Sequence, residues 1–91
     1  MSKVGIRVKK DNTDIVNYSV VISQNYLYEY VVTLFDDEVQ VVDTFTDIYQ
    51  NLAFDSAITY LRNDIGVIID VFEIPTDPFF IEMIQKFKAT I

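Results

Sequence analysis

The chain has 91 residues, a net charge of −7 and an apolar fraction of 51%, which predict one acidic globular domain with its own hydrophobic core. It contains no Cys, no His and no Trp. These absences exclude a disulfide scaffold, a zinc finger and the small hydrolases whose nucleophile is activated by His.

The first ten residues interleave charged and apolar side chains, whereas a signal peptide has an uninterrupted apolar segment. No apolar run approaches the roughly 18–20 residues that cross a bilayer. We therefore expect a cytoplasmic protein that does not bind membranes. The two glycines are isolated and far apart, so no glycine-rich phosphate loop is present, and we expect no cofactor.

Four strands are predicted in the first half of the chain. Apolar residues alternate with basic or small ones over residues 4–9 and with mostly polar ones over residues 15–23. Turn chemistry separates these strands at residues 11–14, and an acidic triplet at residues 36–38 precedes a strand at residues 39–45. Short polar turns between consecutive strands predict an antiparallel meander.

Residues 26–35 are predicted to form one long strand, because they are rich in aromatic and β-branched side chains and contain no Gly or Pro. Side chains alternate between the two faces of a strand, so Tyr26, Tyr28 and Tyr30 should lie in a row on one face. Neither face is plainly polar. We expect a central strand with both faces buried, or with one face left for a partner.

The apolar residues of 46–65 fall on two opposite sides of a helix at about 100° per residue. One straight helix cannot bury both sides against one sheet, so we expect a break near residues 51–55. A short turn or strand extension would precede the break, and a helix capped by Asp55 would follow it and end at Gly66. The two groups are Ile48, Tyr49 and Leu52 on one side and Phe54, Ile58, Leu61 and Ile65 on the other.

Residues 67–74 are predicted to form a fifth strand. Asp70 and Glu73 interrupt its apolar sequence, which is typical of an edge strand whose charges block further pairing. The alternative is a pair of exposed acids offered to a cationic groove.

A final amphipathic helix is predicted after Asp77, which should cap it, with Pro78 at its first position. Lys86 and Lys88 fall in its last turns, where the helix dipole favours cations. Its apolar stripe comprises Phe80, Met83, Ile84, Phe87 and Ile91.

Together these segments predict an α+β fold in a single domain spanning residues 1–91. The expected order is ββββ-α-β-α, with an antiparallel sheet of about five strands. Both helices should pack on one face of the sheet, leaving the other face wholly or partly open.

The charge is distributed unevenly along the sequence. All 14 acidic residues lie between Asp11 and Gln85, and Arg62 is the one basic residue in that span, so its net charge is −13. The other six basic residues lie near the two ends of the chain. Such a field disfavours direct binding of nucleic acid and favours a protein partner with a basic surface.

The sequence therefore indicates a non-enzymatic, acidic protein-binding module. Inhibitors that mimic nucleic acid (anti-restriction and anti-CRISPR proteins), immunity proteins and antitoxins share this profile of charge and size. Such an inhibitor would dock on a basic, nucleic-acid-binding surface. The candidate contact residues are Tyr26, Tyr28, Tyr30, Asp36, Asp37, Glu38, Asp43 and Asp47.

Two alternatives remain open from the sequence. The protein could be a structural homo-oligomer, such as a homodimer, that assembles through the tyrosine-rich sheet face. More remotely, it could be a carboxylate-dependent metal enzyme using the acidic triplet, although consecutive residues of an extended backbone point in different directions. We expect no metal site and no catalytic residue.

Overall fold

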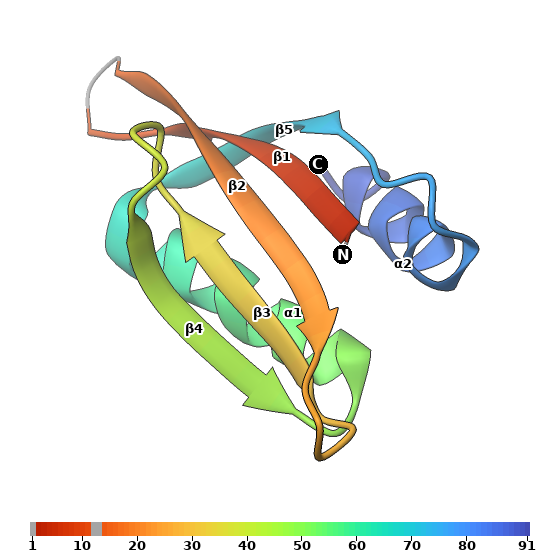
Figure 1. Ribbon diagram of the computed structural model, residues 1–91. Helices are drawn as coiled ribbons and strands as arrows, with labels where there is room; N and C mark the ends of the chain where they lie inside the picture. The colour runs from red at the N-terminus through yellow and green to blue at the C-terminus, as the bar shows by residue number, and fades with distance from the viewer. Residues whose placement is uncertain (1, 12–13) are drawn as a thin grey trace.

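The computed structural model describes residues 2–11 and 14–91 and shows the expected α+β fold (Figure 1). The two central residues of the predicted first turn, Asn12 and Thr13, lie outside the described residues. The elements in chain order are β1 (Ser2–Lys9), β2 (Ile15–Gln24), β3 (Tyr30–Phe35), β4 (Val41–Asp47), α1 (Gln50–Tyr60), a π-helical segment η1 (Leu61–Ile65), β5 (Val67–Glu73) and α2 (Pro78–Lys88).

The five strands form one antiparallel sheet in the order β4-β3-β2-β1-β5. The first four strands are a meander, as their short connections predict. β3 is flanked by β2 and β4 and is therefore a central strand, as expected. β5 returns to pair with β1 and forms an edge of the sheet, which confirms the prediction from its charges.

One face of the sheet carries the hydrophobic core. Alternate residues of each strand point toward α1 and α2, which both lie on this side, and no helix of the described residues covers the opposite face (Figure 1). Within the described residues, the strands and helices share one cluster. Its fully buried members include Val4, Ile6, Val8, Val20, Ile22, Val32, Leu34, Phe54, Leu61, Val71 and Ile84.

The predicted break near residues 51–55 is wrong. α1 starts at Gln50 and continues into η1, and Asp55 is an exposed residue inside the helix. The prediction assumed that both apolar sides of this segment had to be buried. Ile48 and Tyr49 precede α1, in the segment predicted as a turn or strand extension, and are 61% and 59% exposed. Within α1 the side containing Phe54 is buried and Leu52 is 45% exposed, so one helix suffices.

Gly66 ends the helical segment, as predicted, but for a different physical reason. Its φ of 167° is extended backbone rather than the left-handed conformation of a usual C-terminal glycine. A Cβ atom at this position would overlap the backbone carbonyl of Lys9. Glycine is needed here because β5 starts in close contact with the end of β1.

The C-terminal helix starts as its sequence predicts, but it ends at Lys88, so Ile91 of the predicted stripe lies beyond it and is 46% exposed. The Asp77 carboxylate accepts a hydrogen bond from the backbone N–H of Phe79 at 2.9 Å, and Pro78 occupies the first helical position. Ile84 is completely buried. The Phe87 ring meets the ring of Phe54 from α1 edge-on, with centroids 5.3 Å apart, so the two helices are joined through the core.

Candidate functional site

The β2–β3 turn carries two of the tyrosines that were predicted to line a strand face. β3 starts only at Tyr30, so Tyr26 and Tyr28 project from the turn and are 89% and 78% exposed. Leu27 between them is 59% exposed. Tyr30 is half-buried against the Phe80 ring of α2. The prediction of three tyrosines in a row on one sheet face is therefore wrong.

Asn25 holds this turn in place. Its side-chain oxygen accepts hydrogen bonds from the backbone N–H groups of Leu27 and Glu29, at 2.9 and 3.0 Å. Tyr28 also donates its backbone N–H to the Asn25 carbonyl. Tyr28 has a φ of 62°, a left-handed conformation that Gly or Asn usually occupies. The polar side chain of Asn25 thus closes a turn that has no glycine.

The β3–β4 turn repeats this arrangement with the acidic triplet. The Asp36 carboxylate accepts hydrogen bonds from the backbone N–H groups of Glu38 and Gln40, at 3.0 and 2.9 Å. Val39 takes the left-handed position with a φ of 61°, which is why β4 starts at Val41 rather than at residue 39. Asp36 is consequently part of the turn's structure, while Asp37 and Glu38 are exposed to solvent.

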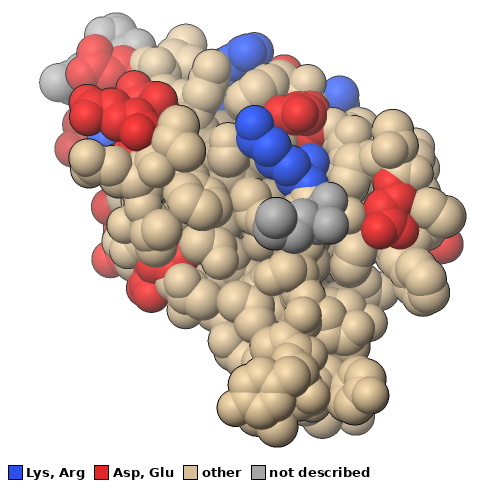
Figure 2. Space-filling view, in the orientation of Figure 1, with Lys and Arg blue, Asp and Glu red and all other residues tan. Residues whose placement is uncertain are grey.

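The end of β1 and the start of β2, which Asp11 and Asp14 adjoin, lie at the same end of the sheet as the β3–β4 turn (Figure 1). Acidic side chains gather at this end and continue along the β4 side of the molecule (Figure 2). In residues 2–11 and 14–91, none of the exposed acids at this end forms an ion pair. We call Asp11, Asp14, Asp37 and Glu38 the acidic end.

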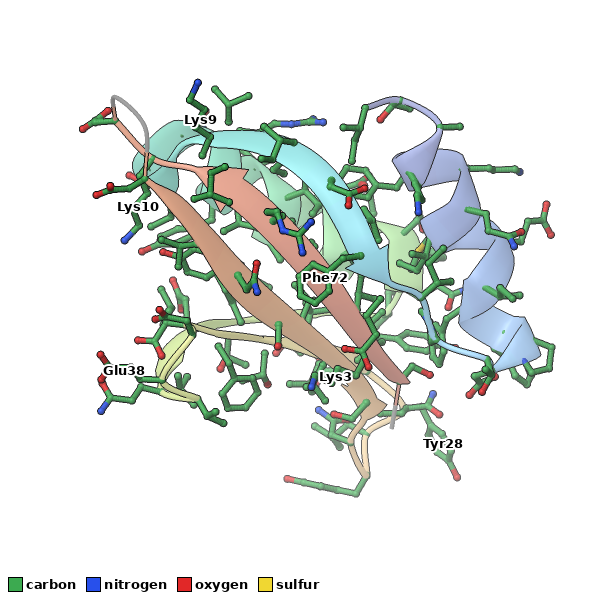
Figure 3. All side chains as sticks on the ribbon, turned by 90° about the horizontal axis from the view of Figure 1, so that it is seen from above. Lys3, Lys9, Lys10, Tyr28, Glu38 and Phe72 are labelled. Carbon is green, nitrogen blue, oxygen red and sulfur yellow. The ribbon has the colours of Figure 1, made fainter. Side chains whose placement is uncertain are left out.

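The structure divides the predicted contact residues into two groups. Glu38 and Tyr28 lie at opposite ends of the molecule (Figure 3). Asp43 is exposed on β4. Asp47 lies at the other end of β4 beside Tyr30, and its carboxylate accepts a hydrogen bond from the Tyr49 backbone N–H at 3.0 Å.

Two of the three basic residues of β1 form ion pairs with acids of β5. Lys3 lies 3.7 Å from the Glu73 carboxylate, and Arg7 lies 3.5 Å from that of Asp70. The Arg7 guanidinium also covers the Phe72 ring at 4.9 Å. The acids of β5 thus face cations of the neighbouring strand, as on a protected edge strand.

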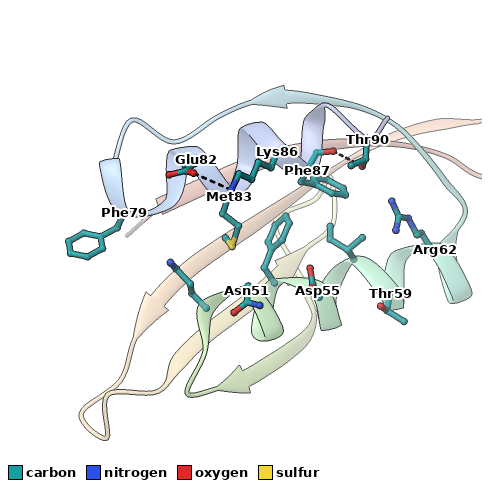
Figure 4. Close-up of a pocket in the computed structure, with 13 residues that line it drawn as sticks. Asn51, Asp55, Thr59, Arg62, Phe79, Glu82, Met83, Lys86, Phe87 and Thr90 are labelled. Carbon is teal, nitrogen blue, oxygen red and sulfur yellow. Dashed lines mark hydrogen bonds and ion pairs between the residues drawn. The ribbon is translucent and has the colours of Figure 1, made fainter.

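Sequence reasoning missed a groove between α1 and α2 (Figure 4). It has a volume of about 750 Å³. The apolar stripe of α2 indicates a buried side but does not show that Met83 and Phe87 also line an open surface. Phe54, Ile58, Met83 and Phe87 are its apolar lining, and Asp55, Arg62, Glu82 and Lys86 supply charged groups around it.

No protein-family model, curated protein or solved structure matches the chain. In the described part of the chain, no group of three or more acidic side chains is placed to hold a metal ion. Among the described residues, no helix has the length and apolar character needed to cross a membrane. Function has to be inferred from the surfaces described above.

Proposed function

We propose that the protein is a non-enzymatic binding module that presents its acidic end to a basic surface of another protein. The supporting observation is the position of Asp11 and Asp14, beside the adjoining ends of β1 and β2, at the same end of the sheet as Asp37 and Glu38 in the β3–β4 turn (Figure 1). Asp70 and Glu73 have cationic neighbours in their own chain, whereas no ion pair engages the acidic end within the described residues.

The chemistry of the partner follows from this charge. A group of hydrated carboxylates attracts a cationic surface over roughly one Debye length, about 8 Å at physiological salt, and accelerates association. Lys9 and Lys10 at the end of β1 offset only part of this charge. A protein surface that normally binds nucleic acid has the required Lys and Arg side chains. Occupying that surface would block the nucleic acid, so inhibition is the proposed effect.

The test begins with capture of partner proteins from the native host and continues with the purified partner. The test variant is Asp11→Asn/Asp37→Asn/Glu38→Gln, which retains Asp36 because that carboxylate closes the turn. We expect its association rate with the partner to fall about tenfold and to depend less on NaCl concentration, because steering is lost. Stopped-flow measurements across a salt series provide the rates.

The matched control is Asp55→Asn/Asp64→Asn/Glu82→Gln, which removes the same charge from exposed helical positions. Its association rate should fall much less. Equal rates for the two triple variants would show that only the net charge matters. A partner that does not contact the acidic end, or that retains its nucleic acid in the complex, would contradict the proposal.

A further inference from the structure

β4 forms one edge of the sheet, and no other strand of the described residues pairs with its outer side (Figure 1). It contains neither Pro nor Lys, two residues that often protect an exposed edge. The register shift between Leu34 and Phe35 of β3 lies at the start of β4, so residues 43–47 pair regularly with β3. Thr44 and Thr46 are exposed. The regular part of β4 is therefore open to an additional strand.

Alternate residues of β4 direct their backbone groups to this free edge. The Thr44 backbone N–H donates to the Asp43 carboxylate at 2.7 Å, so it does not point toward β3. Residues of an antiparallel strand alternate between facing the neighbouring strand and facing away from it, so Thr46 also directs its N–H and C=O outward. An added strand would extend the sheet by pairing with these groups.

The side chains on the helix side of β4 carry negative charge. Asp43, Phe45 and Asp47 share this side, since they pair with residues of β3 that face the helices. With a rise of about 3.3 Å per residue, the two aspartates are about 13 Å apart and Phe45 lies midway between them. Neither aspartate forms an ion pair within residues 2–11 and 14–91. At the other edge of the sheet, by contrast, the acids of β5 already face cations of β1.

The carboxylate of Asp43 makes this edge selective. It occupies the Thr44 N–H, and a carbonyl group of an added strand would have to replace it. A Lys or Arg side chain opposite Asp43 would compensate by pairing with the displaced carboxylate. A second copy of the chain would instead bring its own aspartates to the same face, and like charges on paired strands are unfavourable. The occupant that fits is therefore a cationic strand of another protein.

We propose that β4 binds an extended basic segment of a partner protein, which adds an antiparallel strand to the sheet. Two cations four residues apart in this segment face Asp43 and Asp47, and an apolar side chain between them lies beside Phe45. Antiparallel pairing continues the pattern of the whole sheet and is slightly more stable than parallel pairing. The inference rests on the proposed function, because it takes the partner to be basic, and it names the segment of the partner that binds.

A synthetic peptide tests the proposal directly. The probe is Thr-Lys-Thr-Val-Thr-Lys-Thr with blocked ends, which places its lysines opposite Asp43 and Asp47 and its valine opposite Phe45. Titration of the isotope-labelled protein with up to about 5 mM peptide, followed by NMR, should give a dissociation constant of about 1 mM or lower. The largest chemical-shift changes should fall in residues 43–47, and the Thr46 amide should exchange more slowly with solvent.

Two control peptides separate strand pairing from charge attraction. Thr-Lys-Pro-Val-Pro-Lys-Thr has the same charge but lacks the two N–H groups that would pair with β4, so it should bind about tenfold more weakly or worse. Thr-Glu-Thr-Val-Thr-Glu-Thr can pair but places acids opposite Asp43 and Asp47, so its binding should weaken by about as much.

Variants of the protein give the matching test. Thr46→Pro removes a backbone N–H that points away from the sheet, at an edge where Pro is tolerated, and should weaken binding of the lysine peptide about tenfold. Thr46→Val keeps this N–H and should bind the peptide as the wild-type protein does. Asp43→Asn should weaken binding about two- to fivefold, the effect expected for an exposed ion pair. Urea unfolding of each variant checks that it remains folded.

Three results would overturn the proposal. Unchanged shifts of residues 43–47 at the highest peptide concentration would exclude the site. Equal binding of the lysine and proline peptides would leave charge attraction as the only cause. Shifts of residues 43–47 that appear when the protein is concentrated without peptide would assign the edge to a second copy. None of these titrations involves the acidic end, so the lysine peptide can fail to bind while the acidic-end variant still slows association with the partner.

Discussion

At the scale of single residues, two side chains adopt backbone conformations that are unusual for their type. Tyr28 and Val39 both have a positive φ and occupy equivalent positions in two turns. The left-handed conformation costs a non-glycine residue about 1–2 kcal/mol, and a β-branched residue is especially rare there. Asn25 and Asp36 stabilise the turns by accepting two backbone hydrogen bonds each.

Val39→Gly should stabilise the fold by about 0.5–1 kcal/mol. Removing the left-handed strain raises the free energy of unfolding by about 1–2 kcal/mol. Glycine's greater freedom in the unfolded chain lowers it by about 0.4–1 kcal/mol. Val39 is 77% exposed, so little packing is lost. The measurement is the midpoint of urea unfolding, which should rise while the dependence of the unfolding free energy on urea concentration stays the same.

Val41→Gly is the matched control for this change, because Val41 is also exposed but lies within β4. Glycine in a strand is unfavourable, so this variant should be less stable than the wild-type protein. A loss of stability in Val39→Gly comparable to that of the control would contradict the strain assigned to the turn.

The tyrosine segment shows what the sequence could not reveal at this scale. Residues 26–35 have strong strand preference and no turn-forming Gly or Pro, so their composition predicted one strand. The turn depends instead on hydrogen bonds that the backbone N–H groups of Leu27 and Glu29 donate to the Asn25 side chain. Strand preference describes exposed side chains poorly, because it reflects packing against neighbours that a turn does not have.

At the scale of elements, the helices differ in how well the sequence predicts them. Asp77 and Pro78 mark the start of α2 locally, and its apolar stripe is regular. α1 has no such markers, since its N-cap residue Tyr49 makes no side-chain hydrogen bond. The groove between α1 and α2 depends on how the helices meet, and periodicity within each helix contains no information about that geometry.

Asp77→Ala should destabilise the protein by about 1 kcal/mol, because the backbone N–H of Phe79 loses its acceptor at the start of α2. Thermal and urea unfolding monitored by circular dichroism measure the difference. Asp77→Asn is the control, since asparagine caps helices about as well as aspartate, and its stability should stay close to that of the wild-type protein. Equal losses in the two variants would point to the charge of Asp77 rather than to its capping bond.

At the scale of the whole molecule, the sheet and both helices share one core. Tyr18 of β2 is 3% exposed, Phe54 of α1 is 1% exposed, and Ile84 of α2 has no exposed surface. A domain of this size with one core usually unfolds in a single cooperative transition. Among the described residues, the buried apolar side chains of the strands and helices belong to one cluster.

We therefore expect far-UV circular dichroism, which follows the helices, and tyrosine fluorescence to give the same urea midpoint. Tyr26→Phe/Tyr28→Phe removes the fluorescence of the two turn tyrosines, leaves that of Tyr18, Tyr30, Tyr49 and Tyr60, and should not move the midpoint. A helical transition at lower urea than the tyrosine transition would contradict a shared core. Unfolding measured at several protein concentrations controls for self-association.

The position of β1 has a consequence for the order of events during synthesis. β1 is made first, yet one of its edges is paired by β5, which is made after α1. A nascent chain that has emerged as far as β4 can complete the meander. One edge of β1 then still lacks its strand partner, and the core still lacks Val71 and Ile84. Closing that long loop is slow compared with forming a hairpin. Stable folding should therefore await emergence of β5 and α2 from the ribosome.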